Sequence, residues 1–282
     1  MVGPEGMDSP SPVGPLLIWQ QPHPLMFAEM LYKENPAKEV LEEYEEIVVE
    51  TADFMADFAS WEEENKRYIL GPPVIPAQEN HKGETTCNPT FELAYWRYGL
   101  NVAIQWCQRL NRPVNSKWEH VVEHLSEFPV YDGLYQAHEK ETKTFINKNR
   151  DHPNMIAALG ILNDPNIDRE VMRKTLMKIL ETWQWETSWG WDFPVVAMTA
   201  TRLSEPKIAV DALLMDTIKN TYLDNGHNWQ REGLFIYLPG NGALLTAIAL
   251  MASGWEGEES KGIGFPKDGS WTVKSEGFQL GL

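Results

Sequence analysis

A single carboxylate, Glu79, lies in the segment GPPVIPAQENH (71–81), among prolines and aliphatic residues. Apolar surroundings disfavour the charged form of a carboxyl group and raise its pKa, which keeps the group protonated near neutral pH. A protonated carboxyl group can act as a general acid. A solvent-exposed or helix-capping glutamate is the plainer interpretation. The residues alone leave Glu79 open between a proton donor and a structural acid.

A second loop, within residues 182–203, places several tryptophans around two acids, Glu186 and Asp192. The tryptophans are Trp183, Trp185, Trp189 and Trp191. Indole rings stack on the C–H faces of sugar rings, and nearby carboxylates bind hydroxyl groups. The loop therefore favours a sugar subsite in which Asp192 bonds hydroxyls or holds a water. Alternatively, Asp192 caps the following helix and the tryptophans belong to the core.

A third polar cluster, within residues 222–248, precedes an apolar helical segment. It consists of Asn225, His227, Asn228, Gln230, Glu232 and Asn241. Gly240, Asn241 and Gly242 predict a tight turn at the start of the helix, where backbone N–H groups can face a ligand. We expect this cluster to line the same binding site.

A fourth loop could add His138, Glu139 and His152 to that site, but their spacing does not match a zinc motif such as H-E-x-x-H. His120 and His124 are four residues apart on a predicted helix, with no third ligand evident. The two cysteines, Cys87 and Cys107, lack the repeated spacing of a zinc site or a disulfide framework. We therefore expect no metal and no cofactor.

The elements that must position these loops are helices. Apolar residues recur at helical spacing in eight segments, and strand signals are almost absent, which predicts an all-α fold. Asn35 and Pro36 indicate an N-cap and a first helical residue for the second helix. The segments begin near residue 24 and near residue 36, and then span about 89–110, 115–126, 168–183, 193–203, 205–215 and 241–253.

Charge and hydropathy exclude several partners. The formal net charge of −17 argues against nucleic acid and anionic membrane surfaces, because neutralising phosphates requires clustered Lys and Arg. The longest apolar run, residues 242–255, is shorter than a membrane span and is typical of a core helix. The first residues do not form a secretory signal. A cytoplasmic location is therefore favoured, with a periplasmic or secreted one open if the chain is incomplete at its N-terminus.

Residues 39–81 resemble the stretch that leads to the catalytic acid in the maltose and trehalose phosphorylase family of six-hairpin glycosidases. In that family an acidic helix runs into a GPDEYH loop, followed by an Asn-containing segment. Gly71-Pro72, Glu79-Asn80-His81 and Asn88 match this order, although residues 74–77 are inserted and Gln78 replaces the Asp. The PAQEN segment also resembles the SPEN acid loop of the inverting α-L-fucosidase family. Both resemblances imply that Glu79 is the general acid.

The same resemblances do not identify a single catalytic base. Gly190-Trp191-Asp192 and Thr201-Arg202-Leu203 are similar to the GWS…WARL stretch of the fucosidase family, and Glu232-Gly233-Leu234 is similar to a Glu-Gly-Ile motif beside the phosphate site of the phosphorylases. Where the fucosidases carry DGN, with the Asp near the catalytic water, this chain has Pro239-Gly240-Asn241. The base is therefore Glu232 or Asp192, or with weaker support Glu276.

The start of the first helix faces the sugar site in these relatives, which adds Trp19, Gln20, Gln21 and His23 to the rim. The predicted catalytic residues are thus Glu79, Glu232 and Asp192. The predicted substrate-binding residues are Trp19, Gln20, Gln21, His81, Asn88, His138, Trp189, Trp191, His227, Asn228, Gln230 and Asn241.

The resemblance also implies an (α/α)6 toroid in which the acid follows the sixth of twelve helices. With two helices before Glu79, the eight predicted helices are the fifth to the twelfth, or about four of six hairpins, incomplete at the N-terminus. Such an opened ring leaves core faces uncovered, which predicts self-association or a fragment of a longer protein. We expect a loop segment over residues 1–24 and a toroid-like catalytic domain over residues 25–282.

The function that follows is an inverting glycoside hydrolase with a carbohydrate substrate. Phosphorolysis is the first alternative, although a Ser- or Lys-rich anion site is not evident near residues 232–242. A non-catalytic carbohydrate-binding protein of the same fold is the second alternative, because a fold does not by itself imply chemistry.

Overall fold

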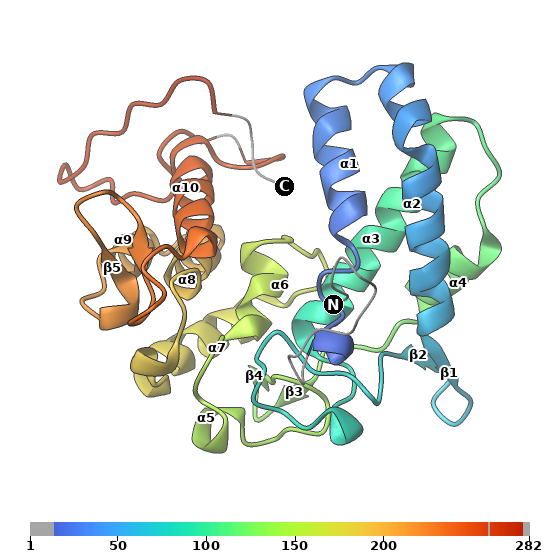
Figure 1. Cartoon of the computed structure of the whole chain (residues 1–282), viewed down its shortest axis with the longest axis horizontal. Coiled ribbons are helices and arrows are strands. Elements are labelled where there is room, and N and C mark those ends of the chain that lie inside the picture. Colours follow the sequence, from blue (N-terminus) through green and yellow to red (C-terminus); the bar gives the residue numbers. More distant parts are fainter. Residues whose placement is uncertain (1–13, 259, 279–282) are drawn as a thin grey trace. The chain divides into compact units, whose positions relative to one another are not determined.

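The computed structural model describes residues 14–258 and 260–278, and its helices dominate the fold (Figure 1). The chain divides into two compact units. The first contains residues up to 129 together with residues 136–142, and the second contains residues 130–135 and the chain from 143 onward. All eight helices predicted from the sequence are present, and the all-α fold class is confirmed.

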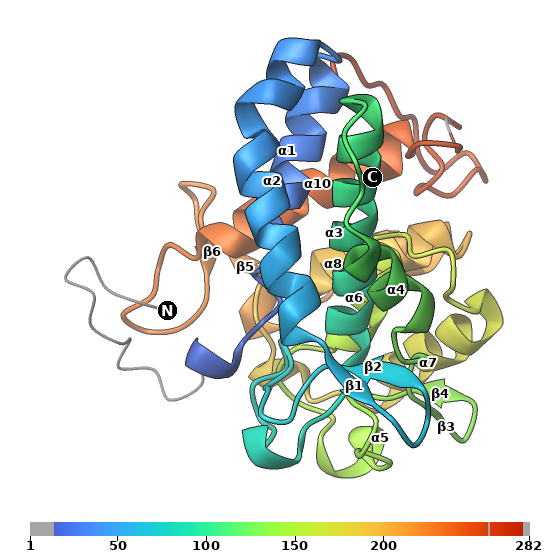
Figure 2. The same cartoon turned by 90° about the vertical axis from the view of Figure 1, so that its right-hand side faces the viewer.

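Three long helices, which lie side by side in Figures 1 and 2, form the core of the first unit. They are α1 (His23–Glu34), α2 (Lys38–Phe58) and α3 (Thr90–Arg109). On α2 the buried residues recur at helical spacing and the glutamates face solvent, as expected for an amphipathic surface helix. The indole N–H groups of Trp96 and Trp106 on α3 donate to backbone oxygens of α2, at Met55 (2.8 Å) and Leu41 (3.0 Å). These tryptophans therefore fix α3 against α2 and are core residues.

Shorter elements complete the first unit. The helix α4 (Ser116–His124) packs on α3, and its Trp118 donates to Asp53 of α2 at 2.8 Å. A hairpin of β1 (Ser60–Glu62) and β2 (Arg67–Ile69) follows α2. The single-turn helices η1 (Gly14–Leu16) and η2 (Gly83–Thr85) flank the segment that carries Glu79, with η1 bonded to it through Ile75 N–H and Leu16 C=O at 2.8 Å.

The second unit is built on α8 (Asp192–Arg202), whose residues are all buried. Packed against α8 are α9 (Pro206–Leu213), α10 (Leu238–Ser253), α6 (Ala157–Gly160) and α7 (Arg169–Thr182). The remaining elements are short, and they connect the helices. They are β3 (Val130–Tyr131), β4 (Leu134–Tyr135), α5 (Thr144–Asn147), η3 (Asn154–Ile156), η4 (Trp185–Thr187), η5 (Ile218–Asn220), β5 (Thr221–Tyr222) and β6 (Asn228–Trp229).

Three details of the sequence prediction were wrong. The N-cap of α2 is Ala37 and not Asn35, because the chain leaves α1 at Asn35 and stays non-helical until Lys38. The single-turn helices α5 and α6 were missed, since four residues are too few to show a helical period. The glycines at 240 and 242 form no separate turn, because α10 already begins at Leu238, with a proline in its first turn.

Within the described residues, the sheets are three antiparallel hairpins of two or three residues per strand. In the same part of the chain, no helix combines the length and apolar character needed to cross a membrane.

Candidate active site

Glu79 is exposed, in contrast to the residues that precede it. Residues 74–78 are buried, with Gln78 fully so, and His81 is 7% exposed. The backbone of this segment is held on both sides, since Val74 N–H donates to Gly83 C=O at 3.3 Å and Ile75 N–H donates to Leu16 C=O at 2.8 Å. The apolar residues just before Glu79 are therefore buried, whereas Glu79 itself is exposed.

A buried carboxylate behind this segment supports it. Glu92, in the first turn of α3, is fully buried, and one of its oxygens accepts the Ala77 N–H at 2.6 Å. The other oxygen, Oε2, has no hydrogen-bond partner among the described residues. Burial raises the pKa of Glu92 to about 7, with the Ala77 N–H acting in the opposite direction. Glu92 is thus a second carboxyl group beside the Glu79 segment, and its pKa is raised by burial.

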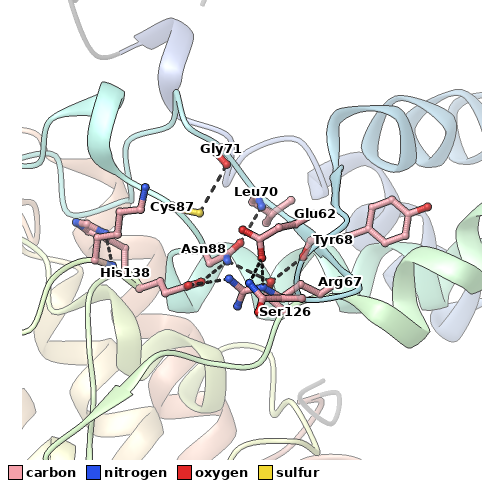
Figure 3. Close-up of polar contacts among 12 residues, drawn as sticks. Glu62, Arg67, Tyr68, Leu70, Gly71, Cys87, Asn88, Ser126 and His138 are labelled. Carbon is pink, nitrogen blue, oxygen red and sulfur yellow. Dashed lines mark hydrogen bonds and ion pairs between the residues drawn. The ribbon is translucent and has the colours of Figure 1, made fainter.

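The side chain of Asn88, which follows this segment, bonds to Leu70, Ser126 and Glu139 (Figure 3). Its side-chain oxygen accepts Leu70 N–H at 2.8 Å, and its own N–H donates to Leu70 C=O at 2.9 Å. Its amide nitrogen donates to Ser126 Oγ at 3.1 Å and to the Glu139 carboxylate. A positive φ of 50°, which Asn tolerates better than most residues, allows this geometry. Asn88 was predicted to bind substrate, and here it makes four contacts within the protein.

The segment 136–142 is fixed to the start of α3 and to the Asn88 network. Thr90 donates from its hydroxyl to Gln136 C=O at 2.6 Å and from its backbone N–H to Ala137 C=O at 3.3 Å. Glu139 accepts Arg67 Nη2 at 2.8 Å, and Arg67 Nε also donates to Glu62 at 2.7 Å. These bonds place His138, which is 5% exposed, with its ring edge-to-face against His81 at a centroid separation of 4.9 Å.

In the second unit, Asp192 is 2% exposed and both of its oxygens are occupied. Oδ1 accepts His152 Nδ1–H at 2.8 Å, and Oδ2 accepts Trp189 N–H at 2.8 Å. Burial raises the pKa of Asp192, and the adjacent His152 partly offsets this effect. Asp192 is the first residue of α8 and does not cap its own helix. It instead bonds the loop before the helix to His152.

The aromatic rings of this loop fall into two groups. Trp183 is buried and donates its indole N–H to Asp151 C=O at 2.7 Å. Trp189 and Trp191 are half-buried, and Trp191 lies 4.6 Å from the His152 ring between centroids. Trp189 also donates to Asp151 Oδ1 at 3.0 Å. Trp189 and Trp191 therefore keep the partial exposure that sugar stacking requires, and Trp183 does not.

Two buried amides hold the loop at residues 188–190. Gln230 accepts Gly190 N–H at 3.0 Å and donates to Ser188 C=O at 3.1 Å. Asn228 packs against two glycines, since a Cβ at Gly190 or Gly240 would lie 1.9 Å or 2.5 Å from Asn228 Oδ1. This contact explains why both positions are glycine. Asn228 and Gln230 are fully buried, so their contacts in this structure are with the protein.

Other predicted residues are more accessible. Glu232 is exposed in the turn between Arg231 and Leu234, and Glu276 is exposed near the C-terminus. His227 is half-buried, and Asn241 is half-buried within α10, where it accepts Asn228 N–H at 3.0 Å. The remaining rim residues belong to the first unit: Trp19 and Gln20 are half-buried and Gln21 is exposed.

Three residues around Glu79 were missed by sequence reasoning: Gln78, Glu92 and Glu141. Gln78 is fully buried, and its oxygen accepts the His81 Nε2–H at 3.0 Å. Glu92 had a usable signal, because it is an isolated acid in the otherwise apolar and aromatic run FELAYW. Glu141 had none, since several acids and lysines surround it in the sequence.

No protein-family model matches the chain, and no curated protein matches it. Among solved structures, it matches one described as "Putative kojibiose phosphorylase from human microbiome", with a TM-score of 0.55 and 8% identity. The match covers 76% of this chain and 38% of that chain, so this chain spans less than half the length of its neighbour. At this identity the match shows the fold alone, which agrees with the predicted (α/α)6 toroid type.

Proposed function

We propose that this protein cleaves glycosidic bonds, with Glu79 as the proton donor. The observation that carries the proposal is that Glu79 is exposed directly after the buried residues 74–78, on a segment held by the bonds of Ala77 to Glu92 and of His81 to Gln78. A general acid must reach the substrate and must be held in a fixed position, and this arrangement meets both requirements. The fold shared with a protein described as a phosphorylase of the disaccharide kojibiose supports the substrate class.

In the hydrolytic form of the reaction, the Glu79 proton passes to the leaving oxygen as the bond from that oxygen to the anomeric carbon breaks. A water attacks the same carbon from the opposite face and gives its proton to a second carboxylate, which inverts the anomeric configuration. Of the two candidate bases, both in the second unit, Glu232 is exposed, whereas both Asp192 oxygens are bonded to the protein. Trp189 and Trp191, which are half-buried, are the candidate stacking residues of the second unit.

Phosphorolysis is the second candidate, and the description of the structural neighbour favours it. In this reaction inorganic phosphate replaces the water, attacks the anomeric carbon and becomes the sugar 1-phosphate. This reaction needs no protein base, so Glu232 would have no catalytic role in it.

One incubation separates these reactions. The protein is mixed with a panel of glucose disaccharides, with and without inorganic phosphate, and the anomers that form are followed by NMR. Release of an inverted free sugar without phosphate supports hydrolysis, and sugar 1-phosphate formed only with phosphate supports phosphorolysis. Saturable glycan binding with no product in either arm would contradict both and leave a carbohydrate-binding protein.

The proton donor is tested by Glu79→Gln, with Glu84→Gln as the matched control. Both glutamates are exposed and lie in the same loop region. General acid catalysis contributes about 10²- to 10⁴-fold, so E79Q is expected to lose activity by that factor while its melting temperature stays at the wild-type value. E84Q is expected to change neither. Full activity of E79Q on an unactivated disaccharide would refute the assignment.

A further inference from the structure

Three metal-ligating side chains converge beside the Glu79 segment. His81, His138 and Glu141 each offer a ligand atom, and these atoms lie within 4.8 Å of one another. They come from two parts of the chain, about 57 residues apart, which the bonds of Thr90 to the segment 136–142 bring together. The two histidines are buried and Glu141 is half-buried, so the group lies below the surface with one partly accessible side.

The orientation of His81 suits metal binding. Gln78 Oε1, which lies 3.0 Å from His81 Nε2, can only accept a hydrogen bond, so Nε2 carries the proton. In the neutral ring, the other nitrogen, Nδ1, then keeps its lone pair. Metal-bound histidines almost always donate their second ring N–H to an oxygen acceptor, which fixes the ring and its tautomer. Fully buried Gln78 supplies that acceptor here.

His138 and Glu141 are brought together by a turn. Glu141 N–H donates to His138 C=O at 3.0 Å, which places the two side chains three residues apart on one loop. The contact from Lys140 N–H to His138 Nδ1 is long, at 3.3 Å, so a cation at that nitrogen would replace a weak hydrogen bond.

We propose that His81, His138 and Glu141 bind a divalent transition-metal cation of the zinc type. Two imidazoles and one carboxylate form a ligand set that zinc uses when a fourth position is left for water. Mg²⁺ and Ca²⁺ prefer sites made of oxygen atoms alone, so the two nitrogens select against them. With bonds of about 2.1 Å, tetrahedral ligands lie about 3.4 Å apart. Since the ligand atoms lie within 4.8 Å of one another, each pair must close by at most about 1.4 Å. The half-buried Glu141 carboxylate is the part best able to move.

Metal binding at this site goes beyond glycoside cleavage and does not depend on it. The cation would cross-link the Glu79 segment to residues 138–141, because His81 lies two residues after Glu79.

The test is calorimetric titration of the whole, chelator-treated protein with ZnCl2, with MgCl2 as a second titrant. We expect saturable binding of one zinc per chain and none of magnesium. At a zinc concentration 100 times Kd, the melting temperature should rise by about 5–10 °C. Absence of saturable zinc binding would overturn the proposal.

Variants then locate the ion. A change in a residue that orients a metal ligand weakens metal binding by about 10- to 100-fold, and we expect a loss of this size for Gln78→Ala. We expect a larger loss of zinc affinity for each ligand variant, His81→Gln, His138→Gln and Glu141→Gln. The matched control is His120→Gln, because His120 and His124 stack at 4.3 Å on α4 and could chelate a metal by themselves. If H120Q loses zinc affinity and H81Q keeps it, the site is elsewhere.

Cobalt substitution locates the ion in the wild-type protein, so this measurement does not depend on whether the variants fold. Visible d–d bands of the Co²⁺-loaded wild-type protein report a four- or five-coordinate site with nitrogen and oxygen ligands. A sulfur-to-cobalt charge-transfer band would place the ion on Cys87 or Cys107 and would overturn the assignment.

Discussion

The Glu79 segment of the first unit and the tryptophan loop of the second use carboxylates in opposite ways. In the Glu79 segment, the exposed acid belongs to the loop, and the buried acid, Glu92, supports it from a helix. In the tryptophan loop, the prominent acid, Asp192, is itself buried and both of its oxygens are bonded. Each region thus has one carboxylate that accepts a backbone N–H and fixes the loop. Of Glu79, Glu92 and Asp192, Glu79 is the exposed one.

The difference teaches that an acid next to aromatic or apolar residues is not thereby a catalytic acid. Asp192 was a candidate base because tryptophans surround it in the sequence, but it is 2% exposed and its Oδ2 accepts the backbone N–H of one of them, Trp189. Whether Asp192 or Glu232 serves as a base stays a prediction. The following variants test the division between supporting and exposed carboxylates.

The largest effect on stability is expected at Glu92. Its pKa is about 7 in the folded protein, above the ordinary value of 4.5, so the folded state keeps a proton that the unfolded chain releases between these two values. The free energy of unfolding therefore falls as the pH rises through this window, by about 3 kcal/mol from this group, and levels off above pH 7. Glu92→Gln removes the titrating group, so its stability relative to wild type should rise by that amount across the window.

Urea unfolding at several pH values from 4.5 to 8 measures this slope. Glu84→Gln serves as the control, because Glu84 is exposed, and its profile should parallel the wild-type one. If E92Q and wild type keep a constant difference at all pH values, Glu92 does not support the loop as a buried, protonated acid.

A smaller loss is expected at Asp192. Asp192→Asn places an amide where two N–H groups converge, so one of the hydrogen bonds from His152 and Trp189 must be lost. The cost of a buried donor left without an acceptor is about 1–3 kcal/mol. Urea unfolding of D192N measures it, with Asp132→Asn as the control, because Asp132 is exposed in a turn at a φ that Asn also adopts.

The activity of D192N sharpens the comparison. A variant that unfolds like the wild type but has lost at least 100-fold in turnover would make Asp192 a catalytic base. That outcome would contradict its role as a support for the loop.

The smallest effect is expected at Trp189. Trp189→Phe keeps an aromatic ring but removes the N–H that donates to Asp151 at 3.0 Å, at a cost of about 1 kcal/mol. The matched control is Trp185→Phe, because the Trp185 indole nitrogen makes no hydrogen bond among the described residues and its ring packs on Phe193 at 5.6 Å. Thermal unfolding of both variants gives the difference. Equal losses would show that the Asp151 contact does not stabilise the loop.

Much of the fold could be predicted from the sequence. The apolar stripe of α2, with Leu41, Val48 and Met55 on one face, is a local pattern that only a helix explains, and the structure buries those residues. Helix starts were less predictable, as at Lys38 and Leu238, because a cap depends on a few residues and on the loop that leads into it.

Whether the predicted loops form a site stays a prediction, but the structure shows what several of their amides bond to. The loops at 71–81, 182–192 and 222–241 do carry clustered polar side chains. However, Asn88, Asn228 and Gln230 bond to backbone and side chains of their own unit, because buried backbone groups in irregular loops need partners. In the sequence, an Asn or Gln whose side chain bonds to the backbone of a loop cannot be told from one that binds a sugar.

The sequence by itself determined the helices, because helical period is a property of short stretches of the chain. Only the tertiary structure decided which acids are buried and which donors converge. Glu92 meets Ala77 across 15 residues, and His81 meets His138 across 57. The burial and the pKa of a side chain depend on such contacts between residues distant in the sequence, and a local sequence pattern does not predict these contacts.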